Sequence, residues 1–150
     1  MQKITRILFV IALTFATSAT LFAQSAEEKA AVEKTLWNYL DGGTYGDTTR
    51  LIAAFHPSAS MKFVDNKTGE FRDVPIETYL NNARKNAGKT SDRKCRVLSY
   101  DIDGTAAQAK VEIDFGTGMF HDYFNLLKIN GEWKIVSKIF YRIDKQEKGG

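Results

Sequence analysis

The stretch that decides the fold is FHDYFNLLKINGEWKIVSKIFYRI, residues 120–143. At its centre, Asn130 and Gly131 form a dipeptide preferred in two-residue β-hairpin turns, because both positions of such a turn need positive φ. On either side of the turn, apolar and polar residues alternate with the period of a half-buried strand. The stretch therefore predicts a long hairpin in which Ile129 pairs with Glu132.

Counting outward from this turn assigns the side chains of both strands to two faces, because alternate residues of a strand point to opposite sides. One face is mostly apolar and is expected to pack on the core: Phe120, Asp122, Phe124, Leu126, Trp133, Ile135, Ile139 and Tyr141. The other face is mixed: His121, Tyr123, Asn125, Leu127, Lys134, Val136, Lys138 and Phe140. This mixture predicts a homodimer interface, and a monomer with scattered surface apolar groups is the alternative. The centre of the interface would be Tyr123, Leu127, Val136 and Phe140.

The residues before the hairpin divide into strands and helices. Alternation predicts strands over residues 97–102 and 107–115, joined by an Asp-Gly turn. Farther upstream, helical spacing predicts three helices and one short strand. The helices cover residues 25–40, 47–54 and about 75–84, and the short strand covers residues 60–64. Gly42 and Gly43 are expected to end the first helix. Helices followed by an antiparallel sheet predict an α+β domain with the helices packed on one sheet face.

The first 23 residues have the layout of a secretory signal. Two cations and no acid precede an apolar run over residues 7–15, and small residues follow it. We expect cleavage after Ala23, with Ala19 as the alternative, and an N-terminal core helix is the competing interpretation. The run is shorter than the roughly 20 residues of a membrane anchor, so no membrane association is expected after the signal is removed. Residues 24–150 would then form a single secreted or periplasmic domain.

Composition limits the class of protein. The chain has 150 residues, 43% apolar and 26% charged, which fits one globular domain. A lone cysteine, Cys95, excludes an internal disulfide framework. After removal of Lys3 and Arg6 with the signal segment, the chain has 19 Lys and Arg and 18 Asp and Glu, which gives a net charge of +1. We therefore expect no nucleic-acid partner. His56 and His121 lie far apart in sequence, and neither a metal nor a cofactor is expected.

Short motifs in a fixed order suggest a family. Near the start they are Tyr39-Leu40, Gly46-Asp47 and residues 55–59, and near the end they are residues 122–128 and 131–138. The first group resembles the opening of a nuclear transport factor 2-like domain, and the second resembles the putative lumazine-binding branch of that superfamily. The resemblance spans about residues 30–141. It implies a strongly curved sheet wrapped on helices as a cone, with a pocket at the open end, and the superfamily often dimerises.

The resemblance does not fix a function, because the superfamily includes isomerases, dehydratases, polyketide cyclases and non-catalytic modules. We expect a secreted protein that binds a small apolar or aromatic molecule without catalysing a reaction. The pocket would be lined by Trp37, Tyr39, Phe63, Phe124 and Tyr141, with Asp122 on its core face and His56 near its mouth. The alternative, structural interpretation of His56 is a polar residue that caps the end of a helix.

Ketosteroid isomerases of this superfamily use a helix Tyr and a strand Asp to hold an oxyanion, and a second Asp as the base. Tyr39 resembles the helix Tyr by its spacing to Gly46, and Asp122 resembles the strand Asp. Phe63 stands at the position of the base, and its ring cannot take a proton. We therefore expect Tyr39 and Asp122 to meet and to bind a ligand carbonyl or hydroxyl group without enolising it. An Asp122 bonded to backbone is the alternative.

Two other functions stay open on the sequence alone. One is a cofactor-free enzyme of the isomerase or dehydratase kind that uses the Tyr39 and Asp122 pair. The other is a purely structural dimerisation module whose cone is filled by its own side chains.

Overall fold

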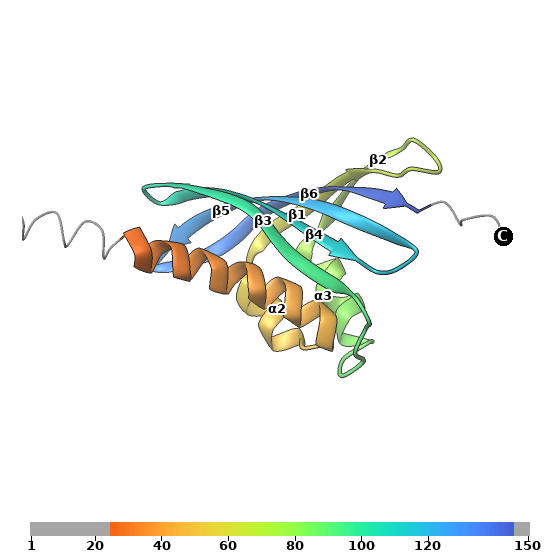
Figure 1. The fold of residues 1–150 in the computed structure, drawn as a ribbon, viewed down its shortest axis with the longest axis horizontal. Coiled ribbons are helices and arrows are strands. Elements are labelled where there is room, and N and C mark those ends of the chain that lie inside the picture. The colour runs from red at the N-terminus through yellow and green to blue at the C-terminus, as the bar shows by residue number, and fades with distance from the viewer. Residues whose placement is uncertain (1–24, 146–150) are drawn as a thin grey trace, which may run out of the picture.

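A single six-stranded sheet with helices on one face forms the molecule (Figure 1). The computed structural model describes residues 25–145. The expected signal segment, with its cleavage points at Ala19 and Ala23, lies outside the described residues. Among the helices of the described part, none is long and apolar enough to cross a membrane. The expected α+β architecture with a curved sheet is confirmed.

The long N-terminal helix, described over residues 25–45, lies along the inner face of the sheet (Figure 1). Val32, Leu36 and Leu40 recur at helical spacing and are completely buried, so this stripe packs on the core. The expected end at two glycines is wrong, because the helix continues through them to residue 45. It ends at Gly46, whose φ of 65° suits a residue without a side chain.

Gly42 and Gly43 serve close packing rather than helix termination. A Cβ atom on Gly42 would lie 2.9 Å from the Cγ of Leu51, and one on Gly43 would lie 1.9 Å from the Nη2 of Arg93. The missing side chains let the next helix and the Arg93 guanidinium approach the helix backbone. Arg93 uses this position to donate a hydrogen bond to the carbonyl oxygen of Leu40.

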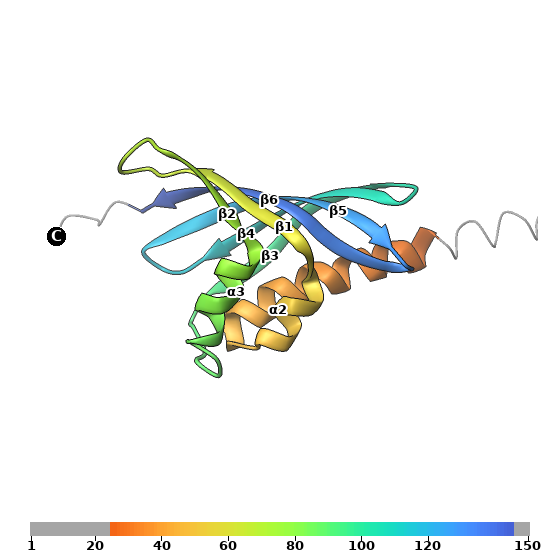
Figure 2. The same ribbon diagram turned by 180° about the vertical axis from the view of Figure 1, so that it is seen from behind.

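The two short helices follow the sequence prediction closely. Helix α2 spans Thr48–Ala54, and the Asp47 side chain accepts a hydrogen bond from the backbone N–H of Arg50. This is the N-cap expected from the sequence. Helix α3 spans Ile76–Arg84 directly after Pro75. Both short helices lie on the same side of the sheet as the long helix (Figure 2).

The strands follow the order β2-β1-β6-β5-β4-β3 across the sheet. Their bounds are β1 Phe55–Val64, β2 Phe71–Pro75, β3 Lys94–Asp103, β4 Ala106–Asp114, β5 Gly118–Ile129 and β6 Glu132–Asp144. β1 pairs with β6 in parallel, and all other neighbours pair antiparallel. The expected short strand is longer than predicted and begins directly after α2. β2 was not predicted, because its residues are mostly exposed and lack alternation.

The hairpin of β5 and β6 begins as expected. Ile129 pairs with Glu132, and Leu126 pairs with Ile135. The register then shifts by one residue, because Val136 forms a bulge in β6. From that point, the predicted pairing is wrong.

Beyond the bulge, the predicted faces of β6 are exchanged. Asp122 lies opposite Phe140 rather than Ile139. Lys138 is buried, whereas Ile139 and Tyr141 are 52% and 58% exposed. The expected inward position of Tyr141 and the expected outward position of Phe140 are both wrong, and the extra residue in the strand is the physical reason.

The helices cover only part of the inner sheet face. The hairpin of β1 and β2 and the end of β6 extend past α2 and α3 (Figures 1 and 2). The inner face is therefore closed by helices over one half, and the other half forms the open end at which a site can lie.

Candidate functional site

Three polar side chains meet inside the closed half, and we call them the polar triad: Tyr39 from the long helix, Asp122 from β5 and Lys138 from β6. The Tyr39 hydroxyl donates a hydrogen bond to Asp122 Oδ2 over 2.6 Å. Lys138 Nζ donates to the same oxygen over 2.8 Å and to the Tyr39 hydroxyl over 2.7 Å. The expected approach of Tyr39 and Asp122 is confirmed, and Asp122 bonds to side chains rather than to backbone.

Burial shifts the acid–base properties of the triad. Burial, together with the negative charge of Asp122, raises the pKa of Tyr39 well above its ordinary value. Burial lowers the pKa of Lys138, and the attraction of Asp122 opposes this change. The Lys138 ammonium also lies 4.9 Å from the ring centre of Tyr39 and 4.7 Å from that of Phe140. One carboxylate, the Tyr39 hydroxyl and the ring of Phe140 thus compensate a cation removed from water.

Asp122 leaves one oxygen without a partner. Its side chain is fully buried, and Oδ1 has no hydrogen-bond donor among residues 25–145. A buried acceptor without a donor costs about 1–3 kcal/mol, and a carboxylate oxygen has room for two donors. A ligand O–H or N–H group that reached Oδ1 would remove this penalty.

Aromatic rings lie between the triad and the open end. Phe140 stacks on Phe63 at 4.5 Å between ring centres, and it meets the edge of Phe120 at 5.7 Å. Phe115 lies 5.1 Å from Phe120. A cavity of about 340 Å³, which we call the mouth pocket, opens beside these rings. It is lined by Phe63, Val64, Asp65, Asn66, Lys67, Phe120, Phe140, Arg142 and Asp144.

Phe140 connects the mouth pocket with the triad. Its ring lines the pocket on one side and contacts the Lys138 ammonium on the other. Phe140 therefore lies between the mouth pocket and Lys138, which is not part of the pocket lining. The described residues contain no cluster of three or more His, Cys, Asp or Glu side chains able to hold a metal ion.

The structure separates the other residues that were expected to line the pocket. Phe124 is buried and packs edge-on against Tyr39 at 5.2 Å. Trp37 is 38% exposed, so its expected position in the pocket is wrong, because this part of the helix turns away from the inner stripe. Tyr141 lies on the outer face beyond the bulge. His56 is half-buried, and its Nδ1 pairs with the Ser58 hydroxyl at 2.8 Å, which is a local structural role.

Lys138 and Phe140 are not predicted to face inward, although the structure places Lys138 in the polar triad and Phe140 in the lining of the mouth pocket. Strict alternation put both on the outer face. The adjacent apolar residues Ile135 and Val136 were the available signal, because a bulge adds one residue to an alternating strand.

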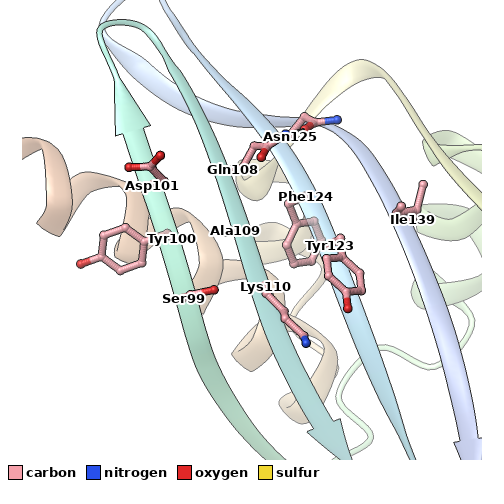
Figure 3. Close-up of a pocket in the computed structure, with 10 residues that line it drawn as sticks. All are labelled: Ser99, Tyr100, Asp101, Gln108, Ala109, Lys110, Tyr123, Phe124, Asn125 and Ile139. Atoms are coloured by element: carbon pink, nitrogen blue, oxygen red, sulfur yellow. Dashed lines mark hydrogen bonds between the residues drawn. The ribbon is translucent and has the colours of Figure 1, made fainter.

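A second hollow lies on the outer face of the sheet, away from the helices (Figure 3). It has a volume of about 460 Å³ and runs across β3, β4, β5 and β6. Its polar groups interact with one another: Gln108 donates to Asn125 over 3.3 Å, and the Lys110 ammonium lies over the Tyr123 ring. The outer groove therefore lacks the unsatisfied buried group found at Asp122, and we place the candidate site inside.

The expected dimer interface is only partly on this outer face. Tyr123 and Leu127 are exposed there, and Val136 is half-buried. Phe140 faces inward, so its expected place at the interface is wrong. Ile139 and Tyr141 take its place on the outside, and the face remains a mixture of apolar and polar side chains.

Comparison with known proteins adds a family and a fold. A family model described as putative lumazine-binding matches residues 27–141. A nuclear transport factor 2-like protein from Shewanella baltica has a solved structure that is 30% identical, with a TM-score of 0.71, over 80% of this chain and 97% of that chain. A second protein of this kind, from Silicibacter pomeroyi, has a solved structure that is 25% identical, with a TM-score of 0.69. The match covers 79% of this chain and 98% of that chain.

A curated relative carries the name of an enzyme. It is the aldolase FrzH of a Cladobotryum species, which is 26% identical over 119 residues, or 78% of this chain and 93% of the relative. The chain and these relatives therefore share the whole domain rather than a fragment.

Proposed function

The chain belongs to the putative lumazine-binding family of nuclear transport factor 2-like proteins, and on this premise we propose that it binds a small apolar or aromatic molecule. The ligand would stack on the rings of the mouth pocket and place one polar group against the triad. The observation that carries the proposal is the buried Asp122 Oδ1, which lacks a donor within the described chain. Apolar walls with a few converging polar groups are typical of small-molecule sites.

The chemistry of the triad defines which polar group fits. Asp122 Oδ1 accepts a hydrogen bond from a ligand hydroxyl or N–H group. Lys138 has three N–H donors and gives two to Asp122 and Tyr39, so the third is available to a ligand carbonyl. A ligand that carries a hydroxyl, amide or carbonyl group beside an aromatic ring satisfies both requirements.

Native mass spectrometry of the protein purified from its host tests this function. We expect a small molecule to be retained by the folded protein and released on unfolding. Asp122→Asn keeps the size of the side chain but removes its charge, and should weaken retention at least about tenfold, the effect of losing one charged hydrogen bond. Asp101→Asn, on the outer groove, is the matched control and should retain the ligand. An empty protein that no aromatic alcohol or ketone stabilises against heat would contradict binding and favour a structural module.

A cofactor-free enzyme is the second candidate. The aldolase name of the Cladobotryum relative favours it, as do the shifted pKa values of Tyr39 and Lys138 in a shared site. Phe63 is a ring stacked on Phe140, so the proton acceptor of an isomerase is not supplied at that position. Incubation with aldehyde and ketone pairs, followed by nuclear magnetic resonance, would detect carbon–carbon bond formation. Activity that survives Asp122→Asn would argue against the triad as its source.

We also propose a homodimer through the outer sheet face. Tyr123, Leu127, Ile139 and Tyr141 are exposed there and support a partly apolar contact. Light scattering should give twice the chain mass at tens of micromolar, and Leu127→Glu should give the monomer. A monomer for the unmodified protein under the same conditions would remove this part of the proposal.

The site of action is proposed to be outside the cytoplasm, either secreted or periplasmic. The support is the signal-like pattern of residues 1–23. Sequencing the N-terminus of the protein from its host should find Gln24 or Thr20 as the first residue. An uncleaved Met1 on the host protein would contradict the proposal.

A further inference from the structure

We propose that Lys138 captures a carbonyl ligand covalently, as an imine between its Nζ and an aldehyde or ketone carbon. This inference rests on the proposed function, because it requires a ligand in the mouth pocket. It adds the class of ligand, an aryl or apolar carbonyl compound, and it assigns Lys138 as the residue that bonds to it.

The environment of Lys138 sets it apart from the surface lysines. Its side chain is 7% exposed, whereas the side chains of Lys62 and Lys145 are 40% and 41% exposed. Its Nζ lies beside the hydroxyl edge of the Tyr39 ring and over the Phe140 ring. Removal of a lysine amine from water favours its neutral form, and the neutral form is the nucleophile.

The charged and titratable groups around Lys138 come from three other segments. Asp122 of β5 and Tyr39 of the long helix bond to its Nζ directly. Arg93, in the segment before β3, lowers the pKa of Lys138 further by repulsion, in the same direction as burial. Asp122 opposes both effects, and it also offers an acceptor for the proton that the amine must lose.

The Asp122 carboxylate supplies the acid–base step through Oδ2, the oxygen to which Lys138 Nζ donates. The Lys138 ammonium passes a proton to the Asp122 carboxylate, and the neutral nitrogen attacks the carbonyl carbon. A C–N bond forms and the C=O π electrons move to oxygen, and one proton of the now cationic nitrogen moves to this oxygen to give a hydroxyl. The C–O bond then breaks, and the oxygen leaves as water with the proton returned by Asp122. An ammonium and a carbonyl are thus converted into a protonated imine and water, with no oxidant or reductant needed.

The path to the amine crosses a single ring. The mouth pocket ends on Phe140, whose ring centre lies 4.7 Å from Lys138 Nζ. Imine formation requires the Phe140 ring, which is only partly buried, to move aside from this position. A carbonyl on a ligand stacked against Phe63 and Phe120 would then meet Nζ and Asp122 Oδ1 together.

Reductive trapping tests the proposal directly. The purified protein is incubated with 4-phenyl-2-butanone and sodium cyanoborohydride, which reduces an imine to a stable secondary amine and leaves the ketone intact. The modified lysine is then located by peptide mass mapping. We expect the adduct to form at Lys138 in preference to the exposed Lys62, because burial lowers the pKa of Lys138 and favours its neutral amine. Lys138→Arg should abolish the adduct, and Lys62→Met should leave it unchanged.

A second ligand separates this inference from the function on which it rests. The alcohol 4-phenyl-2-butanol has a similar shape but cannot form an imine, and it should raise the melting temperature of the unmodified protein. Stabilisation by the alcohol without an adduct at Lys138 would overturn the covalent role and leave the binding function standing. An adduct spread evenly over exposed lysines would also overturn it. A protein that neither compound modifies nor stabilises would contradict both proposals.

Discussion

One carboxylate oxygen of Asp122, Oδ2, accepts hydrogen bonds from Tyr39 and Lys138. The other, Oδ1, has no donor within the described part of the chain. A buried ion pair contributes little net stability compared with apolar residues of the same volume, whereas loss of one partner is costly. Stability alone therefore gives a weak reason to keep Asp122 and Lys138 inside the sheet. An unfilled acceptor next to a buried amine is better explained by a molecule that completes the site.

A double-mutant cycle measures the coupling between these two residues. Lys138→Met should lower the free energy of unfolding by about 3–5 kcal/mol, because it leaves the Asp122 carboxylate buried without its cation. Adding Asp122→Leu to Lys138→Met should restore part of the loss. Urea denaturation followed by circular dichroism gives the three values. Two effects that simply add would show that the residues do not interact energetically.

At the scale of elements, the junction after the long helix depends on one glycine. Gly46 and Gly88 both have positive φ, but a Cβ on Gly46 would lie 2.8 Å from the backbone nitrogen of Gly88, whereas one on Gly88 would meet nothing within 4 Å. Gly88→Ala should therefore cost only the conformational strain, about 1–2 kcal/mol. Gly46→Ala should cost clearly more, because backbone must also move.

Thermal or urea unfolding of the two glycine variants makes this comparison, since both carry the same strain. Equal losses of stability would show that the close approach between residues 46 and 88 is not important for the fold.

The sequence predicted the helices, the hairpin turn and the meeting of Tyr39 with Asp122, because capping residues, turn residues and periodicity act locally. It could not predict which residues of β6 face the site. Periodicity assumes an unbroken alternation, and the bulge at Val136 arises from how the strand bends between its neighbours. The helix end predicted at Gly42 and Gly43 is wrong for a related reason. Tertiary contacts with Leu51 and Arg93 override the low intrinsic helix propensity of glycine.

For the whole molecule, three buried groups predict how stability changes in alkali. Burial raises the pKa of Tyr79 to about 12 and that of Tyr39 well above its ordinary value. Above about pH 10 the unfolded tyrosines lose protons first, so the unfolded state binds fewer protons and the free energy of unfolding falls with pH. Lys138 acts in the opposite sense at lower pH, because its folded-state pKa is lowered and the unfolded state binds more protons.

Urea unfolding between about pH 7 and pH 12 tests this behaviour. Tyr79→Phe should make the fall in the free energy of unfolding above pH 10 shallower, because one of the three tyrosines with a raised pKa is removed. Tyr45→Phe, at a ring that is 55% exposed, is the control and should leave the slope unchanged. If the free energy of unfolding fell with pH equally steeply in the unmodified protein, Tyr79→Phe and Tyr45→Phe, the assignment of this fall to Tyr79 would be contradicted.

The extra residue in β6 also determines how relatives of the chain must be aligned. Deletion of Val136 would restore regular alternation and still leave Lys138 opposite Phe124 and Phe140 opposite Asp122. A relative that has one residue fewer between the positions of Trp133 and Lys138 can thus keep the same inward-facing residues on a strand without a bulge. The single-residue gap belongs at position 136, and an ungapped comparison would equate Lys138 with a residue that points to the opposite side of the sheet.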